Sequence, residues 1–177
     1  QFNSLTIMLG MGSMILAFAY PFMKRITYWP QLFLGLTFNW GLIMAWTSIT
    51  NELNVEIVIL YISAIFWTLG YDTIYGVQDM SDDEIIGLKS TSIKFKKRPN
   101  FLLISCYSIF FTSLIMIANY MNFNNLSLVI FIIILIHMFY FQIRKLNIND
   151  NLICFKIFKS NNMLGLIVFS ALIVGKL

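Results

Sequence analysis

Long apolar segments alternate with short polar connectors along the chain. Six segments are apolar enough and close enough to twenty residues in length to cross a bilayer as helices. They run from Leu5 to Phe22, Gln31 to Ile49, Val55 to Val77, Phe101 to Met121, Leu126 to Ile143 and Asn162 to Val174. None shows the apolar–polar alternation of a lipid-facing barrel strand, and backbone groups inside a bilayer must be hydrogen-bonded within their own segment. The pattern predicts an all-α, multi-span transmembrane bundle that forms one integral-membrane domain over residues 1–177.

The composition supports a membrane protein and excludes a soluble one. Of the 177 residues, 59% are hydrophobic and 11% are charged, whereas about a quarter of the residues of a soluble domain are charged. The net charge of +4 does not indicate nucleic-acid binding, because the lysines lie between apolar segments rather than among stacking aromatic residues. The expected environment is therefore a lipid bilayer. The two cysteines, Cys106 and Cys154, have no metal-binding spacing.

The basic residues are distributed unevenly between the connectors. Eleven of the twelve Lys and Arg residues follow the first, third or fifth apolar segment. By the positive-inside rule these connectors are cytoplasmic, which predicts a multi-pass protein of a cell inner membrane, or of the mitochondrial inner membrane in a eukaryote. Both chain ends then lie on the opposite face. We expect an odd number of further helices upstream, so that residues 1–177 are an N-terminally incomplete domain.

Acidic residues are concentrated at the cytoplasmic end of the third segment. Five of them fall within thirteen residues: Asp72, Asp79, Asp82, Asp83 and Glu84. An ionisable residue in or near the membrane is costly and by default indicates function. If the helix continues through this region, the rotation of 100° per residue places Asp72, Tyr75, Asp79 and Asp83 within about 40° of one direction. Paired carboxylates suit Mg²⁺ shared with phosphate oxygens, although the acids could instead be a solvated loop that balances the following lysines.

The same segment resembles a known motif. The run Tyr71-Asp72-Thr73-Ile74-Tyr75-Gly76-Val77-Gln78-Asp79-Met80-Ser81-Asp82-Asp83-Glu84, with Gly87-Leu88-Lys89-Ser90-Thr91 after it, resembles the second aspartate-rich motif of the UbiA superfamily of intramembrane prenyltransferases. The Tyr-Asp-Thr and Gly-x-Lys-Ser-Thr flanks are most similar to the branch that acts on 4-hydroxybenzoate. Tyr20-Pro21-Phe22-Met23-Lys24-Arg25 resembles the family's Tyr-x-x-x-Lys segment, and Cys154-Phe155-Lys156 with Asn161-Asn162 resembles the approach to its last helix.

The resemblance implies a nine-helix fold in which the present segments are the fourth to the ninth helices. The family's first aspartate-rich motif, Asn-Asp-x-x-Asp-x-x-x-Asp, does not occur in this sequence. The resemblance therefore implies that the other part of the site lies in a missing N-terminal portion or on a separate chain.

The activity implied is Mg²⁺-dependent transfer of a polyprenyl group from polyprenyl diphosphate to the ring of 4-hydroxybenzoate in ubiquinone biosynthesis. Asp79 and Asp83 are then expected to be catalytic and to hold Mg²⁺, with Asp82 as a supporting partner or alternative ligand. Asp72 is a catalytic candidate on the side of the acceptor's phenol. The candidates for binding the diphosphate are Lys24, Arg25, Tyr20, Tyr75 and Lys89. Lys24 and Arg25 could instead be ordinary cytoplasmic anchors.

Other functions are compatible with parts of the pattern. A haem, menaquinone or chlorophyll prenyltransferase of the same family is the nearest, and the residues that flank the acids argue against it. A cation-binding transporter would place acids near mid-bilayer in a broken helix, whereas these acids lie at one membrane end. An inactive remnant of a truncated gene is consistent with the missing first motif.

Overall fold

The computed structural model describes residues 2–177, and within that range the regular structure is entirely helical. Its elements in chain order are α1 (Ser4–Ala19), η1 (Tyr20–Phe22), α2 (Met23–Ile26), α3 (Pro30–Phe38), α4 (Trp40–Thr50), α5 (Val55–Tyr75), α6 (Met80–Ile85), α7 (Thr91–Lys94), α8 (Pro99–Tyr120), α9 (Asn125–Leu135), η2 (Ile136–Ile143) and α10 (Asn151–Val174). Six helical stretches within residues 2–177 are long and apolar enough to cross a membrane. The all-α, six-span prediction is confirmed.

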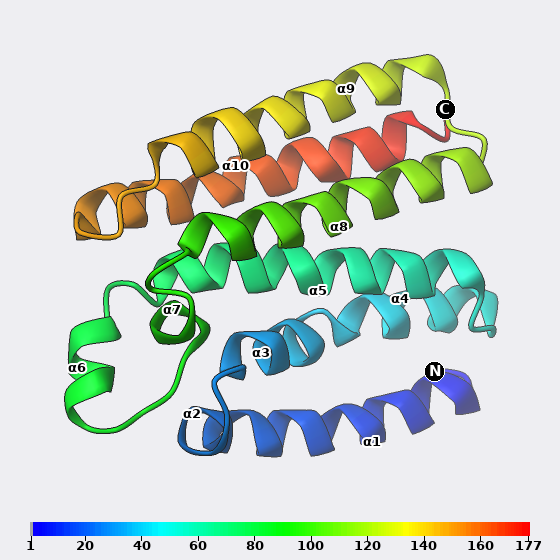
Figure 1. Ribbon diagram of the computed structural model, residues 1–177. Helices are drawn as coiled ribbons and strands as arrows, with labels where there is room; N and C mark the ends of the chain where they lie inside the picture. The colour runs from blue at the N-terminus through cyan, green and yellow to red at the C-terminus, as the bar shows by residue number, and fades with distance from the viewer. Residues whose placement is uncertain (1) are drawn as a thin grey trace.

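The long helices lie side by side, in the order α1, α3 with α4, α5, α8, α10 and α9 (Figure 1). The main core lies between α5, α8, α9 and α10, where Tyr107, Leu114, Ile134 and Leu164 are fully buried. Glycine lets α5 approach α8 closely, since a Cβ on Gly70 would come within 2.4 Å of the Tyr107 ring. Helix α5 is thus central to the bundle, and it carries Asp72 near its C-terminal end.

The sixth span begins earlier than predicted. Helix α10 starts at Asn151 rather than Asn162, because Asp150 caps it: its Oδ1 accepts hydrogen bonds from the backbone N–H groups of Leu152 (3.0 Å) and Ile153 (3.1 Å). Its first three turns contain lysine, serine and asparagine. These polar residues lower the hydropathy of the turns, so a prediction based on hydropathy left the turns out of the span. The predicted start was therefore wrong by three turns.

Two of the spans are irregular. The second breaks at Asn39, whose Nδ2 donates to Gly35 O at 2.8 Å and to Thr68 Oγ1 of α5 at 2.8 Å. Polar contacts of this kind hold membrane helices together. The fifth continues from α9 into a π-helix, η2, which contains the fully buried Gln142. Such π-helical turns are rare and are found frequently at functional sites.

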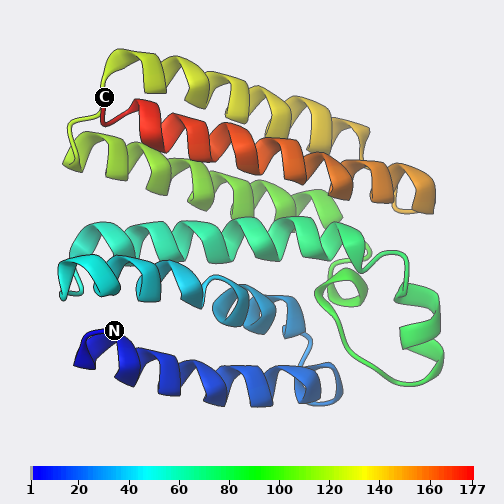
Figure 2. The same cartoon turned by 180° about the vertical axis from the view of Figure 1, so that it is seen from behind.

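The short helices α6 and α7 project from one end of the bundle, beside α2. Viewed from behind, the two chain ends lie at the opposite end (Figure 2). The acidic residues after α5 and the basic residues of α2 therefore meet at the same end of the bundle.

Candidate functional site

The acidic segment does not continue the third span as one helix. Helix α5 ends at Tyr75, the chain turns through residues 76–79, and α6 begins at Met80 with Asp79 as its N-cap. Gly76 makes this turn possible, because a Cβ there would lie 2.6 Å from Ser92 Oγ and 3.1 Å from Gln31 Nε2. The predicted single stripe through Asp72 and Asp83 is therefore wrong, and these acids lie on two helices.

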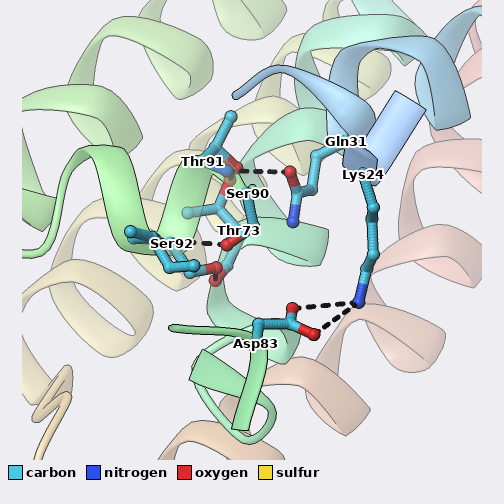
Figure 3. Close-up of polar contacts among 8 residues, drawn as sticks. Lys24, Gln31, Thr73, Asp83, Ser90, Thr91 and Ser92 are labelled. Atoms are coloured by element: carbon cyan, nitrogen blue, oxygen red, sulfur yellow. Dashed lines mark hydrogen bonds and ion pairs between the residues drawn. The ribbon is translucent and has the colours of Figure 1, made fainter. Parts of the chain in front are cut away.

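Asp83 forms an ion pair with Lys24. The Lys24 Nζ lies 3.0 Å from Asp83 Oδ2 and 3.5 Å from Oδ1, and the aspartate side chain is only 8% exposed (Figure 3). The two residues are 59 positions apart in the chain. The ion pair thus joins the aspartate-rich segment at residues 72–84 to the Tyr-x-x-x-Lys segment of η1 and α2. From the sequence alone, these two segments could be associated only by resemblance.

Three further candidates belong to the same cluster. The charges of Lys24 and Asp79 both act on Asp72, which is half-buried at the end of α5. The charges of Asp72 and Lys24 also interact electrostatically with the hydroxyl of Tyr20 in η1. The cluster has one lysine against several carboxylates, so it can accommodate an additional cation.

The donors in this cluster suit Mg²⁺ but do not form a finished cage. Asp79 and Asp83 are one helical turn apart, and both supply hard carboxylate oxygens of the type Mg²⁺ prefers. Within residues 2–177 no three His, Cys, Asp or Glu side chains gather as a metal site. Asp82 is exposed, and the neighbouring Glu84 pairs with Lys96 at 2.8 Å. The residues present fit a metal held by few protein ligands and by phosphate oxygens.

Lys89 forms no ion pair with the acids within residues 2–177. Its backbone N–H donates to Lys24 O at 2.7 Å, and its Nζ donates to Ile26 O at 3.2 Å beside the Tyr28 ring. It therefore ties the loop after α6 to the end of α2. Of the other predicted diphosphate ligands, Arg25 is exposed, and Tyr75 packs on Phe158 with 4.6 Å between ring centroids.

A buried polar seam that the sequence analysis did not identify supports this loop. Gln31 Oε1 accepts from the Thr91 N–H at 2.9 Å, the hydroxyls of Thr73 and Thr91 are 2.6 Å apart, and Ser92 Oγ donates to Thr73 O at 2.7 Å (Figure 3). Gln31 and the two threonines are all less than 5% exposed. The available signal was the Ser-Thr-Ser run at positions 90–92, which is too polar for a span and too weakly charged for a solvated loop.

The fold and the site together define a helical membrane protein with an acid–lysine cluster at one end of its spans. The model of the UbiA prenyltransferase family matches residues 1–169, and the chain belongs to this family.

Several curated relatives resemble the chain over nearly its whole length. It is 39% identical to the mitochondrial 4-hydroxybenzoate polyprenyltransferase of Bos taurus, covering 99% of this chain and 47% of that protein. It is also 39% identical to the 4-hydroxybenzoate octaprenyltransferase of Psychromonas ingrahamii, covering 99% and 61%. The chain thus spans about half to three fifths of the length of these relatives.

A solved structure has the same fold. The apo structure of a UbiA homologue from Aeropyrum pernix superposes with a TM-score of 0.71 at 18% identity, covering 99% of this chain and 66% of that one. The likeness supports the arrangement of the helices.

Proposed function

We propose that this chain forms part of a prenyltransferase that transfers a polyprenyl group from polyprenyl diphosphate to the ring of 4-hydroxybenzoate, the step that commits this ring to ubiquinone. The observation that carries the proposal is the ion pair of Lys24 with Asp83, at the end of the spans where Asp72 and Asp79 also lie. The names of the relatives support the choice of acceptor.

The cluster matches the charge that develops in this reaction. Breaking the allylic C–O bond leaves negative charge on the diphosphate and positive charge on the prenyl carbon, which then bonds to a ring carbon that loses a proton. Asp79 and Asp83 would hold Mg²⁺, which would neutralise the charge on the leaving diphosphate. Lys24, which lies beside Asp83, adds a second positive charge, and a preorganised charge of this kind contributes more where water is excluded.

The ion pair must open when the substrate binds. In the structure Lys24 and Asp83 neutralise one another. A bound diphosphate offers Lys24 a stronger partner and releases the Asp83 carboxylate towards the metal. Metal and diphosphate are therefore expected to bind as a pair rather than one after the other.

Asp72 and Lys89 have different roles in this proposal. Asp72 lies deepest of the acids, at the end of α5, and we assign it the proton that the ring loses. Lys89 positions the loop after α6 through its bond to Ile26 O and is not a diphosphate ligand. The proposed diphosphate site is bordered by Arg25, Tyr20 and Tyr75. Asp82 is an alternative metal ligand.

The membrane orientation is part of the proposal. The acid–lysine end carries most of the basic residues and is placed on the cytoplasmic side, or on the matrix side of a mitochondrial inner membrane. A transporter is disfavoured, because the acids lie at one end of the spans rather than at mid-depth.

The test is prenyl transfer in membranes that contain this chain together with a partner carrying an Asn-Asp-x-x-Asp-x-x-x-Asp loop. We expect Mg²⁺-dependent prenylation of radiolabelled 4-hydroxybenzoate by the pair and none by either part alone. Asp79→Asn or Asp83→Asn removes most of it. Asp150→Asn is the control, because asparagine caps α10 as well as aspartate does. Full activity of the Asp79→Asn, Asp83→Asn double variant would refute the proposal.

A further inference from the structure

A basic cavity lies where the fifth and sixth spans are joined. It has a volume of about 260 Å³, lies between the end of η2 and the start of α10, and is lined by Phe141, Lys145, Ile153, Lys156 and Ile157. This junction is at the same end of the bundle as α6 and α7 (Figure 1). None of the residues assigned to prenyl transfer lines the cavity. It is therefore distinct from the acid–lysine cluster.

The two lysines of this cavity have no anionic partner. Lys145 and Lys156 form no ion pair with any acid within residues 2–177, unlike Lys96, which pairs with Glu84 at 2.8 Å. The acid nearest to them in the chain is Asp150, and its Oδ1 is occupied in capping α10. Two like charges at the wall of one cavity repel each other, whereas an anion between them attracts both. The charge of the cavity therefore suits an anion.

Aromatic rings hold the neighbouring positive charges in place. The Lys145 Nζ lies 4.7 Å from the centroid of the Phe141 ring, which itself lines the cavity, and the Arg144 guanidinium lies 5.1 Å from that of Tyr140. Such a contact orients an ammonium group without using its three hydrogen-bond donors. Residues 140–160 include four basic side chains and one acidic side chain. The region thus presents a net positive charge with donors that remain free for a ligand.

The cavity also has an apolar part and lies at the edge of the membrane spans. The fifth span ends at Ile143 and the sixth begins at Asn151, which places the junction at the depth of the lipid headgroups. Next to the lining residues along the chain, Tyr140 is 59% exposed and Leu152 is 82% exposed. A free inorganic anion would leave the apolar lining in water, whereas a phospholipid covers it with hydrocarbon. Basic pockets between membrane helices are typical sites for anionic headgroups.

From these observations we infer that the cavity binds one anionic phospholipid. Its phosphate lies between Lys145 and Lys156, and its glycerol and the adjoining part of an acyl chain pack against Phe141, Ile153 and Ile157. The lipid joins the end of η2 to the first turns of α10. This site depends on the location of the chain in a membrane and not on prenyl transfer.

The test is lipid binding to the purified chain in a neutral detergent, measured by native mass spectrometry. We expect one molecule of phosphatidylglycerol to bind at least tenfold more tightly than phosphatidylcholine, whose ammonium group offsets the phosphate charge. The Lys145→Gln, Lys156→Gln double variant should bind phosphatidylglycerol at least tenfold more weakly and lose the preference. The control is the Lys97→Gln, Arg98→Gln double variant, which removes two exposed charges outside the cavity and should change the affinity less than twofold.

Two further measurements locate the site and control for misfolding. Phosphatidylglycerol with a diazirine near the glycerol end of one acyl chain should label residues 141–145 and 153–157. The Lys145→Arg, Lys156→Arg double variant keeps both charges and should keep the lipid preference.

Three results would overturn the inference. Equal affinities for the two lipids would show that the cavity does not select an anion. Full preference for phosphatidylglycerol in the Lys145→Gln, Lys156→Gln double variant would show that these lysines do not bind it. Displacement of the lipid by geranyl diphosphate at a lower concentration than by phosphatidylglycerol itself would make the cavity a site for a prenyl diphosphate.

Discussion

The proposed function depends mainly on two side chains, Lys24 and Asp83, which form an ion pair. Asp83 is 8% exposed and Lys24 is 39% exposed, so the carboxylate depends on the lysine more than the lysine depends on the carboxylate. A buried charge that loses its partner is destabilising, whereas an exposed pair contributes little. The chain contains a natural comparison in Lys96 and Glu84, which are 2.8 Å apart and exposed by 47% and 39%.

We predict that Lys24→Met destabilises the protein by about 1 kcal/mol. For a chain of this size that corresponds to a fall of about 2–4 °C in melting temperature. Lys96→Met should leave the melting temperature in detergent within about 1 °C of the wild type, because its pair is solvated. Thermal scans of both variants check this, and equal shifts would show that the Asp83 carboxylate does not depend on its partner.

Gly76 supports a second prediction at the residue scale. Gly76→Ala introduces a methyl group 2.6 Å from Ser92 Oγ, and overpacking of this kind costs about 1–3 kcal/mol. Gly41 also lies in a span, but a Cβ there meets nothing within 4 Å, so Gly41→Ala should be neutral or slightly stabilising. A melting temperature for Gly76→Ala at or above that of Gly41→Ala would contradict the close approach seen in the turn.

At the scale of elements, hydropathy was sufficient to predict five of the six spans to within a few residues, because a bilayer requires long apolar helices. It could not locate the start of α10, where a capping aspartate rather than apolarity determines the boundary. Nor could it show the break after Tyr75, because the seam that holds it joins Gln31 to Thr91 across 60 positions. The acids and Lys24 were recognisable as candidates, whereas their pairing required the fold.

The polar seam gives a prediction for the loop between α6 and α7. Gln31→Leu leaves the buried Thr91 N–H without its acceptor, and an unpaired buried donor costs about 1–3 kcal/mol. Hydrogen exchange over residues 86–95 should become at least tenfold faster, while exchange in α8 stays unchanged. Ser105→Ala removes an exposed hydroxyl bonded only to its own helix and serves as the control. Unaltered exchange in the Gln31→Leu variant would show that the seam does not hold the loop.

At the scale of the whole molecule, the two ends of the bundle differ in charge. The acid–lysine end carries α6, α7 and the basic loops, and the chain ends lie at the other end together with the turn that holds Glu52 (Figure 1). The large apolar side chains exposed along α1, such as Ile15 at 73% and Phe18 at 71%, suit contact with lipid or with further helices.

Cysteine labelling tests the proposed orientation, in which the acid–lysine end lies on the cytoplasmic side of the membrane. In sealed, right-side-out vesicles, an impermeant thiol reagent should modify the Glu52→Cys variant and spare the Lys96→Cys and Lys156→Cys variants. Inverted vesicles should give the opposite result. The native Cys106 and Cys154 are buried and should contribute little background. Labelling of all three variants from one side would contradict the six-span arrangement.

The central claim is that Lys24 and Asp83 exchange each other for diphosphate and Mg²⁺. The most direct measurement is equilibrium binding of a non-hydrolysable prenyl thiolodiphosphate to membranes containing the chain and the partner with the first aspartate-rich motif, at several Mg²⁺ concentrations. We predict that binding requires Mg²⁺, that Lys24→Met and Asp83→Asn each weaken it at least tenfold, and that Lys96→Met leaves it unchanged. Equal affinity in the wild type and the Lys24→Met, Asp83→Asn double variant, with or without Mg²⁺, would contradict the account.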